Sequence, residues 1–297
     1  MSAPLERDEL RSEERRFATS DGVGLSYTVW ARDAESSRTR IIAILPGIGF
    51  HSLPYEVVGS SLPIPGTMFA ALDYRGHGRS EGVRGELRTP ERMTLDVEEW
   101  LSELKVLAPS AHLFLLGESM GGPWAILTAL RRRHKLAGLV LVAPAVIPSW
   151  RLMVRPDSIR VLADLAMRPF SATVDLTGWR LDTGSRDQEF ISLRRKDALA
   201  LDKVSPVYML RIAQGMLQMM LRRHAAVECP VFVAHGGADH VVSPLGSRVL
   251  LLRLSCPEKR LLVLPKAYHT LFWDPCAAVL FNELTHWILQ HSPQNES

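Results

Sequence analysis

The chain has 297 residues, of which 46% are hydrophobic and 23% are charged, which is typical of one large globular domain with an insertion or of two modest domains. Its formal net charge of +3 is too small to indicate a nucleic-acid partner. The three cysteines are widely spaced, which predicts neither a disulfide framework nor a metal site and makes a cytoplasmic location the expectation. Residues 1–16 are charged and contain no apolar core, so we expect no secretion signal. No run of about 18 apolar residues occurs, so we expect no membrane span.

Strand-like and helix-like segments alternate along the chain. Residues 1–15 are polar and are expected to form a frayed arm or a short helix, and the turn signal at 19–24 predicts a hairpin within residues 17–31. Continuous apolar runs predict buried strands at 41–45, 67–72, 112–116, 138–142, 230–234 and 260–264. Helical periodicity and flanking turn signals predict helices at 53–62, 90–106, 123–133, 244–254 and 275–291. This alternation indicates an α/β fold with a mostly parallel, doubly wound sheet.

The alternation stops between about residue 146 and residue 225. We interpret 146–225 as an insertion that forms a helical cap over the carboxyl edge of the sheet, and residues 1–145 and 226–297 as the core. Six of the ten methionines fall in the insertion: Met153, Met167, Met209, Met216, Met219 and Met220. Methionine suits adaptable apolar surfaces, and we assign Met216 and Met220 to substrate binding as a hypothesis. A place in the insertion's own small core is the equal alternative.

Residues 117–121, Gly-Glu-Ser-Met-Gly, lie between a predicted strand and a predicted helix. In this context the Gly-x-Ser-x-Gly pattern predicts a nucleophile elbow, with an ordinary glycine-rich turn as the alternative. A serine at such a turn has a strained backbone, and flanking glycines let strand and helix approach closely. The helix N-terminus behind Ser119 presents N–H groups to an oxyanion.

A serine hydroxyl needs an adjacent base, and the base needs an orienting acid. Asp239 and His269 each follow a predicted strand, at 230–234 and 260–264, so we expect them at the same sheet edge as Ser119. The chain order of serine, acid and histidine is that of α/β-hydrolases. We therefore predict Ser119 as the nucleophile, Asp239 as the acid and His269 as the base.

Other residues compete for these roles. Asp274 is the alternative acid, although it occupies an expected helix N-cap. His235 is interpreted as structural and His240 as directed elsewhere, while His286 and His291 are expected to be solvated on the last helix.

An oxyanion hole requires two N–H donors. We expect one from Met120, directly after the predicted nucleophile, and the other from Ile48 in the loop at 46–49. The segment Gly47-Ile48-Gly49 is not a dinucleotide fingerprint, because Ser52 stands where the third glycine is needed. The loop at 73–80 is interpreted as a turn fixed by its own hydrogen bonds, with phosphate binding through its basic residues as the alternative.

Together these motifs resemble the monoacylglycerol lipase and lysophospholipase group of α/β-hydrolases. The resemblance rests on Gly-x-Ser-Met-Gly-Gly, Asp-Tyr-Arg-Gly-His-Gly-Arg-Ser, Gly-Gly-Ala-Asp-His-Val-Val and Ala-Tyr-His, and it extends over about residues 16–290. It implies the α/β-hydrolase fold and a serine hydrolase with a helical cap over an apolar acyl tunnel. By position it implies the roles already predicted for Ser119, Asp239, His269, Ile48 and Met120.

The chain departs from this group in the oxyanion loop. Pro46 stands where the group usually has histidine, and Phe50 stands where it often has glutamate. The missing histidine takes no part in proton transfer, so we expect catalysis to be retained. The geometry of the loop and the recognition of a glycerol headgroup are left open.

We therefore expect a carboxylic ester hydrolase that forms an acyl-enzyme and needs neither a metal nor an organic cofactor. A monoacylglycerol or lysophospholipid is the leading substrate class, and peripheral membrane contact through the cap is a further expectation. A small-ester carboxylesterase or a thioesterase on the same triad is the alternative, and a non-catalytic ligand-binding protein is the alternative from another class. The oligomeric state is left open.

Overall fold

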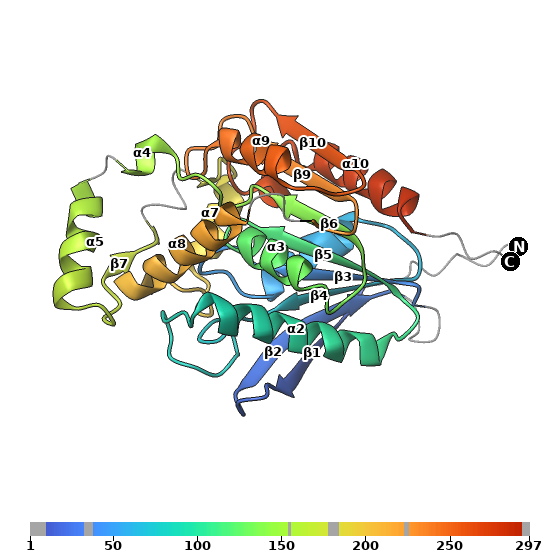
Figure 1. Ribbon diagram of the computed structural model, residues 1–297, viewed down its shortest axis with the longest axis horizontal. Coiled ribbons are helices and arrows are strands. Elements are labelled where there is room, and N and C mark those ends of the chain that lie inside the picture. The colour runs from blue at the N-terminus through green and yellow to red at the C-terminus, as the bar shows by residue number, and fades with distance from the viewer. Residues whose placement is uncertain (1–9, 33–37, 154–155, 178–183, 223–225, 293–297) are drawn as a thin grey trace, which may run out of the picture.

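The structure is a computed structural model, and it describes residues 10–32, 38–153, 156–177, 184–222 and 226–292. Its centre is an eight-stranded sheet with the order β1-β2-β4-β3-β5-β6-β9-β10 (Figure 1). The strands are β1 (Arg11–Ala18), β2 (Gly24–Ala31), β3 (Arg40–Leu45), β4 (Thr67–Leu72), β5 (His112–Glu118), β6 (Leu136–Val142), β9 (Val231–Gly236) and β10 (Lys259–Leu264). The β1–β2 and β2–β4 pairs are antiparallel and the other five pairs are parallel, so the prediction of a mostly parallel sheet is confirmed.

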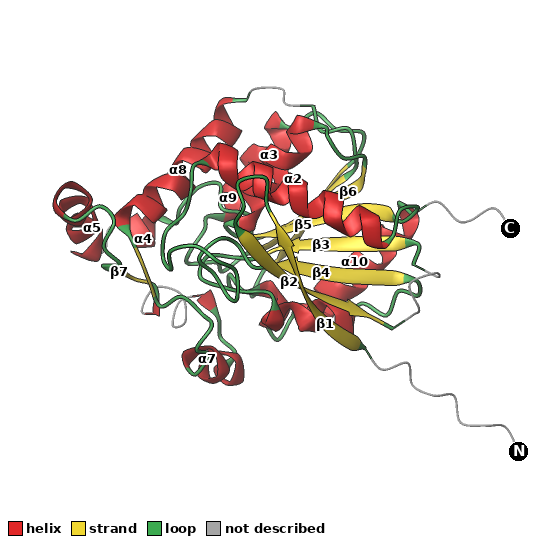
Figure 2. Cartoon of the chain, turned by 90° about the horizontal axis from the view of Figure 1, so that it is seen from below, coloured by secondary structure: helices red, strands yellow, loops and turns green. Residues whose placement is uncertain are grey.

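Helices cover both faces of this sheet, as the burial of its central strands requires. One apolar cluster joins the sheet to α2 (Pro90–Leu107), α3 (Gly121–Arg131) and α9 (Pro244–Arg253). A second cluster on the opposite face joins it to α1 (Glu56–Ser61) and α10 (Ala277–Gln290). Figure 2 shows α2 and α3 on one side of the strands and α10 on the other. The fold is therefore doubly wound, as the alternation of segments predicts.

The N-terminal segment differs from its expected form. Residues 11–18 form β1, which pairs with β2 along its whole length, so a frayed arm or helix is wrong for residues 11–15. The side chains of β1 are mostly exposed and charged, as suits an edge strand, and the backbone ladder rather than apolar burial specifies it. Residues 1–9 lie outside the described part of the chain. The predicted hairpin is confirmed and is longer than expected.

The insertion between β6 and β9 adds no strand to the main sheet within the described residues. It contains α4 (Trp150–Met153), α5 (Pro156–Met167), β7 (Val174–Asp175), α7 (Gln188–Arg195), β8 (Lys203–Val204) and α8 (Pro206–Leu221). The strands β7 and β8 pair only with each other, while α4 and α5 lie beyond the end of the sheet (Figure 1). Helix α8 packs against α3, so the insertion lies over the element that follows the predicted elbow. None of the described helices has both the length and the apolar character that crossing a membrane requires.

Gly138 lies in β6 where α10 packs on the sheet, and it offers a test of this packing. A Cβ atom at this position would lie 2.6 Å from Trp287 Cη2 and 2.9 Å from Phe114 Cδ1. Gly138→Ala should lower the free energy of unfolding by about 1–3 kcal/mol, because both buried rings must shift. Urea denaturation measures this loss. Gly184→Ala is the control, since its added Cβ atom would approach no other atom closer than 3.8 Å, and an equal loss in both variants would contradict the packing argument.

Candidate active site

Ser119 lies in a sharp turn between β5 and α3. Its backbone φ is 50°, in the left-handed region that side chains other than glycine rarely adopt. The turn closes because Gly117 and Gly121 lack side chains: a Cβ at Gly117 would lie 2.5 Å from the Gly121 carbonyl oxygen, and one at Gly121 would collide with the Leu45 carbonyl oxygen. The strained serine between close-packed glycines is the geometry that the elbow motif predicts.

The three predicted triad residues meet at the carboxyl end of the sheet. His269 Nε2 lies 2.8 Å from Ser119 Oγ, and His269 Nδ1 lies 2.7 Å from Asp239 Oδ2. A carboxylate can only accept, so Nδ1–H donates to Asp239 and Nε2 accepts from the Ser119 hydroxyl. All three side chains are buried. This arrangement can move the serine proton to the imidazole as the oxygen attacks an acyl carbon.

The Asp239 carboxylate is held in its charged form. Burial disfavours its charge, but the neighbouring His269 and hydrogen bonds from His235 and His269 outweigh that effect and hold the pKa of Asp239 well below its usual range. Its other oxygen accepts backbone N–H bonds from Val241 at 2.7 Å and Val242 at 2.9 Å. Asp239 is thus an acceptor that fixes the orientation of the His269 ring.

A second histidine contacts the same carboxylate. His235 Nε2 lies 3.1 Å from Asp239 Oδ2, and His235 Nδ1 lies 2.7 Å from Ser247 Oγ. Nε2–H therefore donates to the carboxylate while Nδ1 accepts from the serine hydroxyl. The structural interpretation of His235 from the sequence agrees with this contact, but its partner was not foreseen. In the sequence, the one feature that could indicate this contact is the four-residue spacing of His235 and Asp239 across the end of a strand.

Asp274 has a different set of partners. Its carboxylate forms an ion pair with Arg186, 2.8 Å from Nη2, and accepts the backbone N–H groups of Tyr268 and Cys276. Burial opposes its charge, but these hydrogen bonds lower the pKa of Asp274. The N-cap of α10 is Cys276, so the expected N-cap position for Asp274 is wrong by two residues. Asp274 holds the loop that carries His269 rather than the imidazole itself.

The other three histidines weighed for the site, His240, His286 and His291, have partners other than Ser119. The His240 ring packs edge-on against Tyr268, with the ring centroids 5.0 Å apart. His286 is exposed, in agreement with its interpretation as solvated. His291 is half-buried against Trp287 and lies 3.1 Å from Glu258, so full solvation is wrong for this residue.

The predicted oxyanion loop lies beside the elbow. A Cβ atom at Gly47 would lie 3.5 Å from Ser119 Cβ, which places the next residue, Ile48, close to the predicted nucleophile. Within the described part of the chain, no hydrogen bond uses the backbone N–H of Ile48 or Met120. Met120 directly precedes the first residue of α3, whose N-terminus favours negative charge. Neither amide is used elsewhere among the described residues, and their role as oxyanion donors stays a prediction.

The insertion is fastened to the loops that carry these residues. His51 Nε2 lies 2.7 Å from Asp197 Oδ2, and Arg194 donates to the Gly49 carbonyl oxygen at 3.0 Å. On the other side of the site, the Thr270 backbone N–H donates to the Gly184 carbonyl oxygen at 2.9 Å. The placement of the cap and the placement of the catalytic loops are therefore coupled.

The methionines of the insertion occupy different environments. Met219 is buried and Met209, Met216 and Met220 are half-buried, all against the apolar cluster that contains Met120 and Trp124. Met167 is 78% exposed, and the Met153 side chain lies outside the described part of the chain. Met216 and Met220 thus lie against this apolar cluster, and their predicted role in substrate binding stays a prediction.

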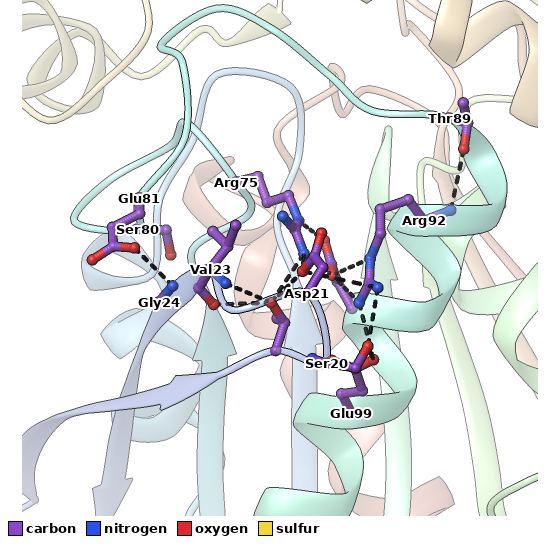
Figure 3. Close-up of polar contacts among 12 residues, drawn as sticks. Ser20, Asp21, Val23, Gly24, Arg75, Ser80, Glu81, Thr89, Arg92 and Glu99 are labelled. Carbon is purple, nitrogen blue, oxygen red and sulfur yellow. Dashed lines mark hydrogen bonds and ion pairs between the residues drawn. The ribbon is translucent and has the colours of Figure 1, made fainter.

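The loop at 73–80 is fixed by its own contacts. Asp73 Oδ2 accepts the Arg79 backbone N–H at 2.9 Å, and Arg75 Nη2 donates to Asp96 Oδ1 at 2.8 Å. Figure 3 shows Arg75 beside Asp21 and Arg92 in one ionic network. Burial opposes the Arg75 charge, but the hydrogen bonds that its guanidinium donates to Asp96 and Asp21 raise the pKa of Arg75. A guanidinium with these partners favours the turn interpretation over phosphate binding.

Across the described ranges, no group of three or more histidine, cysteine or acidic side chains is arranged to hold a metal ion.

Known proteins resemble this chain over most of its length. A protein-family model described as serine aminopeptidase, S33, matches residues 36–276. A monoacylglycerol lipase from Mycolicibacterium smegmatis is 29% identical over 94% of this chain and 97% of its own, and human monoglyceride lipase is 28% identical over 85% and 83%. A soluble variant of Saccharomyces cerevisiae monoglyceride lipase, solved with a substrate analogue, has a TM-score of 0.81 at 22% identity and covers 98% of this chain and 99% of its own. The structural likeness shows the α/β-hydrolase fold.

The two candidate acids can be separated by matched substitutions. Asp239→Asn should lower kcat for a chromogenic ester by about 10³- to 10⁴-fold, because the amide favours the wrong imidazole tautomer. Asp274→Asn should cause a smaller loss, since Asp274 contacts the loop backbone and Arg186. Steady-state assays on both variants give the ranking, and a larger loss in Asp274→Asn would contradict the site as described.

Proposed function

The chain belongs to the serine aminopeptidase S33 family, and on that premise we propose that it is a serine hydrolase that cleaves carboxylic esters of lipids, with a monoacylglycerol or lysophospholipid as substrate. The observation that carries this proposal is the pair of hydrogen bonds that joins Ser119 through His269 to Asp239 at a strained elbow. The similarity to monoacylglycerol lipases over nearly the whole chain supports the choice of substrate class.

The reaction proceeds through an acyl-enzyme. Ser119 Oγ attacks the ester carbonyl carbon while its proton passes to His269 Nε2, and Asp239 stabilises the imidazolium. The backbone N–H groups of Ile48 and Met120 hold the negative oxygen of the tetrahedral intermediate. His269 then gives the proton to the departing alcohol, which leaves the acyl group on Ser119. Water, deprotonated by His269, attacks this ester, and release of the fatty acid restores the serine.

Helix α8 packs against the elbow and carries the proposed wall of the acyl site. A Cβ atom at Gly215 would lie 2.5 Å from Trp124 Cη2, so α8 packs closely on α3 at this point. The Tyr208 hydroxyl lies 3.3 Å from Met120 Sδ, which joins the start of α8 to the elbow. Met216 and Met220 on this helix supply the flexible apolar wall of the site.

The cap, residues 146–225, also contacts lipid surfaces in this proposal. Four large hydrophobic side chains of α4, α5 and the turn after α5 are each at least 67% exposed: Trp150, Leu162, Met167 and Phe170. Several exposed apolar side chains on one insertion favour an apolar partner over water. Because these side chains belong to the insertion, a lipid surface would meet the same insertion that contacts the catalytic loops. The proposed contact with the membrane is peripheral.

A series of esters of graded acyl length tests the proposed substrate. For the wild type, kcat/KM should rise with each methylene by up to about fourfold, or ~0.8 kcal/mol, until the acyl site is full. Met216→Gln should flatten this rise, because a polar side chain disfavours the buried chain. Leu252→Gln is the control, since this apolar side chain is 84% exposed and lies outside the insertion, and Ser119→Ala sets the background.

Monomeric esters and melting temperatures measured alongside separate the possible outcomes. A wild-type preference for acetate over decanoate would contradict lipid specificity and leave a small-ester carboxylesterase. Equal losses at every length in Met216→Gln, with a lower melting temperature, would place Met216 in the insertion's own core. Faster turnover of acyl thioesters, or of aminoacyl anilides, would move the activity to a thioesterase or a peptidase.

A further inference from the structure

Glu118 is the last residue of β5 and directly precedes the strained serine, at the variable position of the elbow motif. Its carboxylate is buried, and it accepts a hydrogen bond from the hydroxyl group of Tyr55. Tyr55 is the last residue of the 3-10 helix η2 (Leu53–Tyr55), which follows the oxyanion loop, and its side chain is also fully buried. The catalytic steps proposed above use neither side chain.

The Tyr55 hydroxyl has a second partner in the oxyanion loop. The backbone N–H of Gly47 donates to Tyr55 Oη at 2.8 Å. Because an N–H group can only donate, the hydroxyl accepts from Gly47 and sends its own proton to Glu118. Burial and the neighbouring Glu118 charge raise the pKa of Tyr55 well above its usual range, so the hydroxyl keeps this proton. The direction of both hydrogen bonds is thereby fixed.

This bridge begins where the β-ladder ends. Strands β3 and β5 pair as far as Leu45 and Gly117; β3 ends there, and β5 ends one residue later at Glu118. Just beyond the last paired residues, the Tyr55 hydroxyl links Gly47 to Glu118 by one hydrogen bond to each. These two residues directly precede Ile48 and Ser119, and Met120 follows. The tyrosine thus connects the two separate loops that supply the proposed oxyanion donors.

We propose that Tyr55 and Glu118 are positioning residues that fix the oxyanion loop against the elbow, so that the N–H groups of Ile48 and Met120 converge on one point. This inference rests on the proposed function, because it needs Ile48 and Met120 to act as oxyanion donors. Two donors stabilise one developing charge only if their mutual position is set before the reaction. The loop needs such support because Pro46 has no N–H group to donate.

The aromatic surroundings keep the tyrosine in place. Its ring packs edge-on against Phe50, Phe272 and Trp273, with centroid distances of 6.1, 6.2 and 5.5 Å. These contacts involve the ring and not the hydroxyl. A phenylalanine at position 55 should therefore keep its packing and lose only the two hydrogen bonds, which makes Tyr55→Phe a clean test of the bridge.

Tyr55→Phe should lower kcat by about 10- to 100-fold, somewhat less than the loss of a complete oxyanion donor, with little change in KM. The Ki of an alkyl trifluoromethyl ketone, which forms a tetrahedral adduct with an oxyanion, should rise by a similar factor. Glu118→Gln should change kcat and the Ki of the ketone only slightly, because the amide oxygen of glutamine still accepts the hydrogen bond from the tyrosine. Glu118→Leu should resemble Tyr55→Phe.

Tyr27→Phe is the matched control, because Tyr27 is also buried and its hydroxyl donates to a glutamate, Glu103, at 3.4 Å. This variant should leave kcat and Ki unchanged whatever its effect on the melting temperature. Unchanged kcat and Ki in Tyr55→Phe, or a loss confined to KM, would overturn the positioning role. Ser119→Ala separates the two proposals: if it abolishes turnover while Tyr55→Phe leaves kcat and Ki unchanged, only the bridge is wrong, and if Ser119→Ala remains active, the proposed function itself fails.

Discussion

The arrangement of the site depends on the backbone at Ser119. A φ of 50° at a serine costs free energy, of order 1–3 kcal/mol, and this conformation persists only because the packing around the turn holds the backbone in it. Gly117 and Gly121 allow β5 and α3 to approach at this point. The same turn directs the hydroxyl toward His269 and the N-terminus of α3 toward the position of an oxyanion.

Three loops from different strands must then be held around this serine. The loop after β9 is ordered by Asp239, which accepts from two backbone N–H groups and two histidines. The loop after β10 is tied to the insertion through Asp274 and Arg186, and the loop after β3 is tied to it through His51 and Asp197. Partly buried ionic and hydrogen-bonded contacts of this kind are costly to break singly, so the insertion supports the geometry of the site.

The sequence predicts most of the fold and the triad because their signals are local. Alternating apolar runs indicate the buried strands, and the elbow motif identifies Ser119 without reference to distant residues. Strand β1 was missed because its ladder with β2, rather than apolar side chains, specifies it. The contact of Tyr55 with Glu118 joins residues 63 positions apart, at a site where the motif accepts any residue. The role of Asp274 depends on Arg186, whose position in the insertion no periodicity reveals.

The central claim is that Ser119 is acylated by a lipid ester, and active-site labelling tests it most directly. The protein is treated with dodecyl fluorophosphonate with and without a long-chain monoacylglycerol, and the adduct is located by peptide mass spectrometry. We expect a single adduct on Ser119, formed more slowly as the monoacylglycerol concentration rises, because both compounds compete for one nucleophile. An adduct on another residue, or labelling of Ser119 that saturating monoacylglycerol does not slow, would contradict the account.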